Sequence, residues 1–380
     1  MEAFFFHNPT KVIFGANQIA NIGSQMKRDK IDKCILVAGG GSIKQNGVYE
    51  QVVHSLEENG VKWVESWGIQ PNPTLEKLEE IINLARKEEV QAVLAVGGGS
   101  VLDTGKATAA GFYMDDIWNA YIGEDKITKA LPIYTVLTLS ATGSEMNGNA
   151  VITNMQTKEK ICVSSGHLYP RLSIIDPAVQ NSLPFKHTAS GAMDAMAHIF
   201  EYYFANDTAL STLAINEALI KTIVESTDRL QANPADINAR SNLAWSSTLA
   251  LNGMTGAGLG YGDWGCHAIE HAISALRPHV SHGEGLGVIF PAWIEYLSEK
   301  DPMRFSRWAK EIWGESSATF GVKQMRLKLS AWGMPLSLRD LGLHQEDLPI
   351  LLDMITKAGS IGNIFKLGRD EIHILLMLCF

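Results

Sequence analysis

The 380-residue sequence contains few cysteines and no Cys-x-x-Cys pair. Its four thiols lie far apart, at Cys34, Cys162, Cys266 and Cys379. This spacing excludes the usual thiolate zinc sites and dithiol redox centres, and it favours a reducing cytoplasm. No apolar run approaches the ~18 residues of a membrane-spanning helix, and the first residues lack the positive start and long apolar core of a signal peptide. We therefore expect a cytoplasmic protein with no membrane partner.

Positive charge is also scarce. Lys and Arg total 32 against 41 Asp and Glu, which gives a formal net charge of -9. The densest basic cluster, Lys27, Arg28 and Lys30, is interrupted by Asp29, so no basic patch suits nucleic acid or an anionic membrane. With 46% hydrophobic residues and 34 glycines, the composition is typical of globular enzymes. We expect small-molecule partners and no nucleic acid.

The first half of the chain alternates short apolar runs with amphipathic segments. Residues 34–38 and 92–96 read as buried strands, and residues 75–89 between them carry apolar positions at helical spacing. Such alternation predicts βαβ units and a mainly parallel, Rossmann-like sheet. We also predict strands over residues 133–139 and 172–175 and an opening hairpin over residues 4–14.

The second half shows only helical periodicity. Apolar residues recur at helical spacing over residues 188–232, 236–254 and 263–276, and no strand alternation returns. Pro177 and Pro184 interrupt regular structure between the two halves. We predict an α/β domain over residues 1–185 and an all-α domain over residues 186–380.

Two glycine-rich segments resemble each other and follow predicted strands. They are Gly39-Gly40-Gly41-Ser42 and Gly97-Gly98-Gly99-Ser100. Glycines after a parallel strand let the backbone approach a phosphate, and the following helix offers unpaired N–H groups. Neither segment matches the Gly-x-Gly-x-x-Gly or P-loop spacing, so structural strand-to-helix turns remain the alternative. A third polar turn, over residues 138–145, offers more hydroxyl and N–H groups.

Two histidine-containing pairs have helical spacing. Asp194 and His198 are four residues apart, as are His267 and His271, and His282 follows after a short turn. Residues at i and i+4 share one helix face, so each pair can chelate one ion. One carboxylate with imidazoles suits Fe²⁺ or Zn²⁺ better than Mg²⁺. Spacing alone leaves open which four side chains converge.

Two classes of enzyme fit these features. One is an oxidoreductase that binds a nucleotide on the α/β domain and a metal on the helical domain. The alternative is a metallohydrolase whose glycine turns are structural. A non-enzymatic scaffold fits less well, because buried Asp and His side chains are costly without a ligand.

Together these motifs resemble the iron-containing alcohol dehydrogenase family, and within it the butanol dehydrogenase and NADPH-dependent aldehyde reductase branch. The resemblance spans almost the whole chain and rests on residues 71–73, 97–103, 141–145, 194–198, 267–271 and 281–285. It implies a dehydroquinate synthase-like architecture, a dinucleotide-binding N-terminal domain and a helical metal-binding domain. The implied reaction is reversible hydride transfer between a nicotinamide and a primary alcohol or its aldehyde.

The resemblance also implies roles for particular residues. The metal ligands would be Asp194, His198, His267 and His282, and His271 would be a second-sphere catalytic histidine. Asp103 would lie near the nicotinamide. The remaining cofactor contacts would be Gly98, Gly99 and Ser100 in the pyrophosphate loop, Thr138, Ser140 and Ser144 in the third turn, and Lys160.

Two further expectations concern the cofactor and the oligomer. The first glycine loop, with Gly41 and Ser42, offers no carboxylate that would repel a 2′-phosphate, so we expect NADP(H) rather than NAD(H). Lys44 either adds positive charge there or is simply solvated. The apolar opening segment predicts an exposed edge that benefits from pairing, so we expect a homodimer.

Overall fold

A computed structural model describes residues 1–380, and the chain forms two compact units. The α/β unit comprises residues 8–183 and 235–244, and the helical unit comprises residues 1–7, 184–234 and 245–380. Each unit therefore includes a short segment that lies far from the rest of it in the sequence. The division into domains 1–185 and 186–380 stays a prediction.

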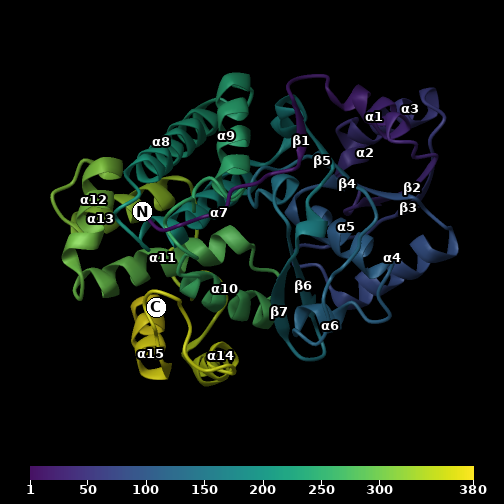
Figure 1. The fold of residues 1–380 in the computed structure, drawn as a ribbon. Helices are drawn as coiled ribbons and strands as arrows, with labels where there is room; N and C mark the ends of the chain where they lie inside the picture. Colours follow the sequence, from purple (N-terminus) through teal and green to yellow (C-terminus); the bar gives the residue numbers. More distant parts are fainter. The chain divides into compact units, whose positions relative to one another are not determined.

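The α/β unit is built on a parallel sheet with the strand order β1-β8-β5-β4-β2-β3. Figure 1 labels β1, β5, β4, β2 and β3 of this sheet. The predicted parallel sheet is thus confirmed. Lys62 and Glu65 interrupt the apolar pattern of β3, an edge strand that sequence periodicity did not predict. The strands are β1 (Lys11–Phe14), β2 (Lys33–Ala38), β3 (Lys62–Ser66), β4 (Ala92–Gly97), β5 (Ile133–Leu137) and β8 (Leu172–Ile175).

Helices cover both faces of this sheet, because successive strand side chains point to opposite sides. Leu36 packs with the residues of α1 and α3, whereas Val37 packs with those of α4 and α5. Burial on both faces explains why the strands read as continuous apolar runs. The four helices are α1 (Ile22–Arg28), α3 (Val48–Glu58), α4 (Leu75–Lys87) and α5 (Gly99–Gly111).

The predicted opening hairpin over residues 4–14 is wrong. Only β1 forms there, and it pairs in parallel with β8. Pro9 explains the difference, because it has no N–H for a ladder and restricts the residue before it. Residues 1–7 instead belong to the helical unit, where the Glu2 N–H donates to the Gly258 carbonyl at 3.0 Å. The real hairpin is the antiparallel pair β6 (Asn149–Asn154) and β7 (Glu159–Ser164).

The helical unit contains none of the strands of either sheet, as predicted. The helical periodicity over residues 188–232 corresponds to two helices, separated by a turn at Asn206, whose Oδ1 accepts the Thr208 N–H at 2.7 Å. The helices of this unit are α7 (Phe185–Tyr203), α8 (Leu210–Ala232), α10 (Gly265–Leu276), α11 (His282–Ser298), α12 (Pro302–Trp313), α13 (Ala318–Ala331), α14 (Leu348–Ile355) and α15 (Arg369–Leu378), and α9 (Ile237–Ala250) contributes residues to both units.

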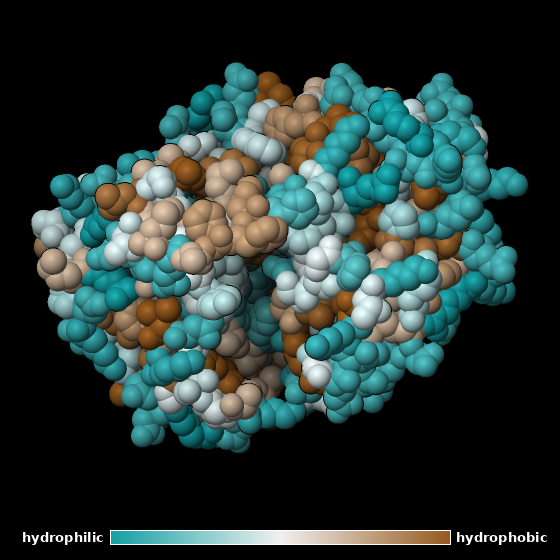
Figure 2. Space-filling model, viewed as in Figure 1, coloured by the Kyte–Doolittle hydropathy of each residue, from teal (hydrophilic) through white to brown (hydrophobic).

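The surface is mixed in polarity. On the face drawn in Figure 2, hydrophobic residues form separate brown groups among hydrophilic ones. Phe4, Phe5 and Phe6 are among the exposed large hydrophobic residues. None of the helices combines the length and the apolar character that crossing a bilayer requires.

Candidate active site

Three polar turns of the α/β unit lie at the same edge of the sheet. Residues 39–42 follow β2, residues 97–100 follow the end of β4, and residues 138–145 follow β5. These strands are adjacent and parallel, so their carboxyl ends lie side by side. The Thr138 N–H donates to the Gly97 carbonyl at 2.9 Å, which joins the second turn to the third. Doubly wound folds bind their ligands at this edge.

The glycines of these turns serve two different needs. Gly41 has a left-handed backbone, φ 109°, and a Cβ added there would meet nothing within 4 Å. A Cβ on Gly99 would lie 2.5 Å from the Thr142 side chain. The first turn thus needs glycine for its backbone conformation, and the second needs it for close approach to the third turn.

Asp103 and Ser144, both predicted to contact a cofactor, contact each other. The Ser144 hydroxyl donates to Asp103 Oδ1 at 2.5 Å, and the Val151 N–H donates to Asp103 Oδ2 at 3.0 Å. Both side chains are buried. Asp103 therefore ties α5 to the third turn and to β6.

Lys106 makes a second connection between α5 and the third turn. It is fully buried, and its ammonium donates to the Asn147 carbonyl, to Asn147 Oδ1 and to the Asn149 carbonyl at 2.8, 3.0 and 2.9 Å. Asn147 in turn donates to the Gly143 carbonyl at 2.8 Å. Burial lowers the pKa of Lys106 to about 8. The Lys106 ammonium therefore holds protein groups of the Asn147–Asn149 segment.

The first turn is flanked by aromatic rings. Ser42 is exposed at the start of α2 (Ser42–Gln45). The Lys44 ammonium lies 4.1 Å from the centre of the Trp67 ring and 5.0 Å from that of Tyr49, so this exposed lysine makes cation–π contacts with both rings. The Glu65 carboxylate accepts the Tyr49 hydroxyl and two indole N–H groups, and these donors and Lys44 lower its pKa despite partial burial.

The other predicted cofactor residues are spread over two sheets. Gly98 precedes α5 as its N-cap, and Ser100 lies in the first turn of that helix. The Ser140 hydroxyl donates to Gln180 Oε1 at 3.0 Å. Lys160 lies on β7, in the separate two-stranded sheet, where it pairs with Thr153. Their predicted contacts with a cofactor stay predictions.

The predicted metal ligands come together within the helical unit. Asp194 and His198 lie on α7, His267 lies on α10, and His282 is the first residue of α11. One ligand atom from each lies within 4.8 Å of the others. Three of the four side chains are buried, and His282 is partly exposed. Helical spacing places Asp194 and His198 on one face of α7. The packing of α7, α10 and α11 brings His267 and His282 to this pair.

The distances inside this cluster leave room for an ion. Asp194 Oδ1 lies 3.6 Å from His198 Nε2 and 3.7 Å from His282 Nε2. These separations exceed a hydrogen bond, and they are close to the ~3.4 Å expected between two ligand atoms that bind one ion tetrahedrally at about 2.1 Å. The four donors therefore fit a divalent ion of borderline softness.

The protonation of the cluster agrees with this use. Burial, together with the neighbouring imidazoles of His267, His282 and His271, holds the pKa of His198 well below its usual range. A neutral imidazole offers a lone pair to a metal, which a protonated one does not.

Two buried glutamates that were not among the predicted site residues contact the histidines. Glu201 Oε1 lies 2.6 Å from His267 Nδ1, and Glu270 Oε2 contacts His282 Nδ1. Burial raises the pKa of Glu201 to about 8, against the opposing effect of the backbone N–H groups of Trp264 and His267. Glu201 and Glu270 each follow a candidate histidine by three residues, a spacing that places both side chains on the same helix face. This spacing is the sequence signal that could have indicated them.

Two glycines of α11 let the ligand-bearing helices approach each other. A Cβ on Gly283 would lie 1.9 Å from the Ser190 carbonyl oxygen of α7, and a Cβ on Gly285 would lie 2.8 Å from Glu270 Cγ of α10. A side chain at position 283 would require the backbone of α7 to move, and one at position 285 would displace the Glu270 side chain. The glycines beside His282 therefore belong to the construction of the cluster.

His271 lies beside the four-residue cluster rather than in it. Its ring centre is 5.5 Å from that of His282, and its ligand atom groups with those of Glu270 and His282. It lies one helical turn beyond His267 on α10. Its predicted catalytic role stays a prediction.

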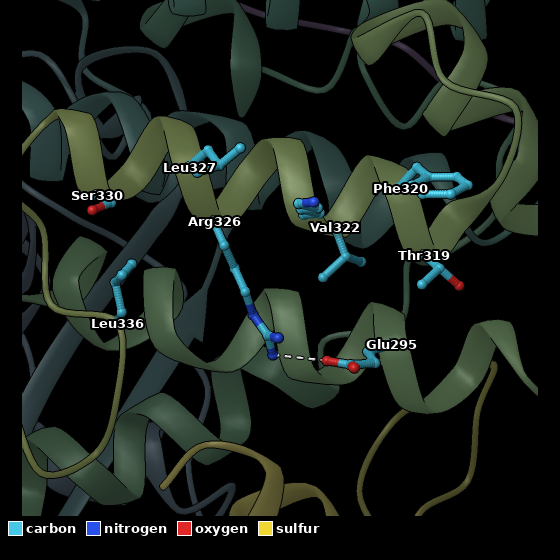
Figure 3. A pocket seen from close by; sticks show the side chains of 9 residues that line it. Glu295, Thr319, Phe320, Val322, Arg326, Leu327, Ser330 and Leu336 are labelled. Carbon is cyan, nitrogen blue, oxygen red and sulfur yellow. Dashed lines mark ion pairs between the residues drawn. The ribbon is translucent and has the colours of Figure 1, made fainter.

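The helical unit also carries a surface cavity of about 390 Å³, lined by residues of α11, α13 and the segment after α13. In Figure 3, Arg326 of α13 reaches toward Glu295 of α11, with which it pairs at 2.8 Å. None of the predicted site residues lines this cavity.

Comparison with known families covers both units. The model "Iron-containing alcohol dehydrogenase" matches residues 9–177, and the model "Fe-containing alcohol dehydrogenase family, C-terminal" matches residues 188–379.

Similar proteins match over nearly the full length. The chain is 36% identical to NADH-dependent butanol dehydrogenase A of Clostridium acetobutylicum, with 98% of each chain covered. It is 32% identical to an NADPH-dependent aldehyde reductase of Escherichia coli, with 94% of each covered. The crystal structure of an NADH-dependent butanol dehydrogenase A from Thermotoga maritima superposes with a TM-score of 0.97 at 48% identity, over 100% of this chain and 99% of that one.

Proposed function

The chain belongs to the iron-containing alcohol dehydrogenase family, and from this premise we propose that it interconverts primary alcohols and aldehydes of butanol-like size with NADP(H). An alcohol dehydrogenase or aldehyde reductase activity with an Asp/His metal site follows from membership. The finer parts of the proposal are the cofactor, the metal, the substrate size and the residue roles. The metal cluster fits both this function and a metallohydrolase. Membership of an alcohol dehydrogenase family favours the first.

The observation that carries the proposal is the cluster of Asp194, His198, His267 and His282, with ligand atoms within 4.8 Å of one another. In our proposal these side chains hold Fe²⁺, with Zn²⁺ as the competitor that binds such donors more tightly. When bound, the ion would act as a Lewis acid on the substrate oxygen, and the nicotinamide would accept or donate the hydride. The protein supplies position and orientation.

The turns at the carboxyl edge of the α/β sheet are the proposed dinucleotide site. Gly98, Gly99 and Ser100 open α5, so their N–H groups suit a pyrophosphate. Thr138, Ser140, Ser144, Asp103 and Lys160 complete the proposed set. Asp103 has both of its carboxylate oxygens engaged by Ser144 and Val151, which favours a role in shaping the third turn.

We propose NADP(H) because of the surroundings of Ser42. Relatives of both kinds exist, since the Clostridium relative is named for NADH and the Escherichia one for NADPH. Gly41 leaves open space, Ser42 is exposed, and Lys44 is held nearby over Trp67. A 2′-phosphate would find a hydroxyl and a cation there.

His271 is the proposed proton-transfer residue. In alcohol oxidation the carbon loses a hydride and the hydroxyl loses a proton, and the reverse reaction returns both. An imidazole is suited to move that proton near neutral pH. His271 is partly exposed and adjoins His282, so it connects the metal cluster with solvent.

We also propose a homodimer. β1 is an edge strand of the sheet, and Phe5 is 90% exposed. Both features are typical of surfaces that pair with a partner. Light scattering at micromolar concentration tests this, and a monomeric mass would contradict it.

One experiment tests the main proposal. The protein is purified anaerobically, its metal content is determined, and a panel of straight-chain aldehydes is assayed with NADPH and with NADH. We expect one divalent ion per chain, activity that disappears on chelation, and a higher kcat/KM with NADPH. A metal-free protein that reduces aldehydes at full rate would contradict it.

A further inference from the structure

We propose that Glu201 and Glu270 are positioning residues that set the tautomer and orientation of two metal-binding histidines. Each carboxylate accepts from Nδ1 of one imidazole and thereby leaves Nε2 for the ion. The proposal rests on the proposed function only in assuming that the ion binds at the Asp194 cluster.

Glu201 holds both the ring and the backbone of His267. It is fully buried on α7, and its Oε1 lies 2.6 Å from His267 Nδ1 and accepts the His267 backbone N–H at 3.2 Å. Its Oε2 accepts the Trp264 N–H at 2.5 Å. Two backbone N–H groups thus engage both carboxylate oxygens, and the His267 ring Nδ1 lies within hydrogen-bond distance of Oε1. In the proposal, Nδ1 of His267 donates to Oε1, and Nε2 carries the lone pair for the ion.

Trp264 has an unusual backbone that serves this contact. It is the N-cap of α10, and its φ of 65° lies in the left-handed region that a tryptophan rarely adopts. In this conformation its N–H points at Glu201, and its ring packs edge-on against His267 with centres 5.1 Å apart. Local strain that the surroundings maintain is typical of functional sites.

Glu270 makes the equivalent contact with His282. It is fully buried on α10, where Oε2 contacts His282 Nδ1 and Oε1 accepts the Ser274 hydroxyl. Gly285 of α11 packs against the stem of Glu270, since a Cβ there would lie 2.8 Å from Glu270 Cγ. The carboxylate is thereby fixed from both helices.

The two contacts also link the helices that supply the ligands. Glu201 of α7 contacts a histidine of α10, and Glu270 of α10 contacts a histidine of α11. Two carboxylate–imidazole pairs thus connect α7 to α11 through α10. His198 differs, because its Nδ1 is buried and makes no hydrogen bond. Contacts of this kind orient metal-binding histidines and make them more basic.

The substitutions Glu201→Gln and Glu270→Gln distinguish charge from geometry. A glutamine at position 201 offers one oxygen to three N–H donors and turns an NH₂ group toward at least one of them. A glutamine at position 270 has an easier solution, because the Ser274 hydroxyl can reverse and accept from the amide. We therefore expect Glu201→Gln to weaken metal binding about 100-fold and Glu270→Gln about 10-fold, the two ends of the usual range.

The measurement uses metal-free full-length protein and Co²⁺ as the probe, with affinity from competition against a chelator and geometry from the visible absorption of bound Co²⁺. The matched control is Glu217→Gln, another buried glutamate of the helical unit, which accepts from Tyr203 and Arg307 and contacts no candidate ligand. We expect it to lower thermal stability and to leave Co²⁺ affinity and absorption unchanged. Unchanged Co²⁺ affinity and absorption in both glutamine variants would overturn the proposal.

Two further readouts keep the test decisive. In wild-type protein with histidine labelled with ¹⁵N, we expect the Zn²⁺-loaded form to show Nδ1–H protons on His267 and His282. The absence of these protons would overturn the proposal even if Glu201→Gln fails to fold. A stoichiometry of two Co²⁺ per chain would also overturn it at Glu270, because Glu270, His271 and His282 would then form a second site. Wild-type protein that binds no Co²⁺ would instead contradict the proposed function.

Discussion

The glycine turns of the α/β unit and the Asp/His cluster of the helical unit are built in opposite ways. In the turns, the groups proposed to bind the dinucleotide are mainly backbone N–H groups, and the side chains of Asp103 and Ser144 bond to each other. In the cluster, the atoms that lie within 4.8 Å of one another are all side-chain atoms. We therefore expect substitutions that add side-chain atoms to disrupt the turns, and substitutions that remove ligand atoms to disrupt the cluster.

The largest expected effect comes from removing a ligand. His282→Ala leaves three protein ligands and should reduce metal content and lower kcat/KM by at least about 10³-fold, because a Lewis acid contributes several kcal/mol to the transition state. Elemental analysis and steady-state kinetics measure both. Affinity for NADPH, from quenching of protein fluorescence, should change little. Full metal occupancy with an unchanged rate would remove His282 from the ligand set.

The fold was predictable where local pattern and burial agree. Strands buried on both faces, such as β2 and β4, stand out as apolar runs, and the Rossmann-like arrangement follows from their alternation with helices. Periodicity did not predict β3, an edge strand whose apolar pattern is interrupted by Lys62 and Glu65. It also predicted a hairpin over residues 4–14, although residues 1–7 belong to the helical unit. A partly exposed strand lacks a continuous apolar run, and packing between segments far apart in the sequence leaves no periodic pattern.

The site was predictable in the same uneven way. Each i, i+4 pair is local and visible, but spacing treats His198, His267 and His271 alike. Which of them converge depends on how α10 and α11 pack on α7, which small residues such as Gly283 and Gly285 permit. The resemblance to a family separated His271 from the ligands. Glu201 and Glu270 each follow a candidate histidine by three residues, but this spacing does not show which helical glutamates are buried against a histidine.

The second prediction tests whether His271 belongs to the chemistry or to the metal. His271→Ala should keep its ion, because His271 is absent from the four-residue cluster, and should lose on the order of 10²-fold in kcat, a modest general acid–base contribution. Metal content and a pH–rate profile are the measurements. Loss of the ion would make His271 a ligand, and an unchanged rate would make it structural.

The third prediction concerns the second glycine turn, where an added methyl group should be destabilising. Gly99→Ala places a Cβ 2.5 Å from Thr142, so we expect the free energy of unfolding to fall by about 1–3 kcal/mol and NADPH affinity to fall as the turns separate. Metal content should not change. Gly40→Ala is the matched control, since a Cβ there meets nothing within 4 Å and the residue has no positive φ. Equal effects of the two variants would contradict the packing argument.

The smallest expected effect concerns the choice between cofactors at the first turn. Ser42→Asp puts a carboxylate at the exposed start of α2, where the helix tolerates negative charge, so the fold should be unaffected. Repulsion of a 2′-phosphate at about 4 Å in water costs on the order of 1 kcal/mol, which predicts a shift of roughly 5-fold in the ratio of kcat/KM for NADPH to that for NADH. Ser42→Asn is the control of similar size without the charge, and it should shift the ratio less. The shift should shrink as salt is added, because an exposed repulsion is screened. A salt-independent ratio that is equal in both variants would show that the phosphate does not bind beside Ser42.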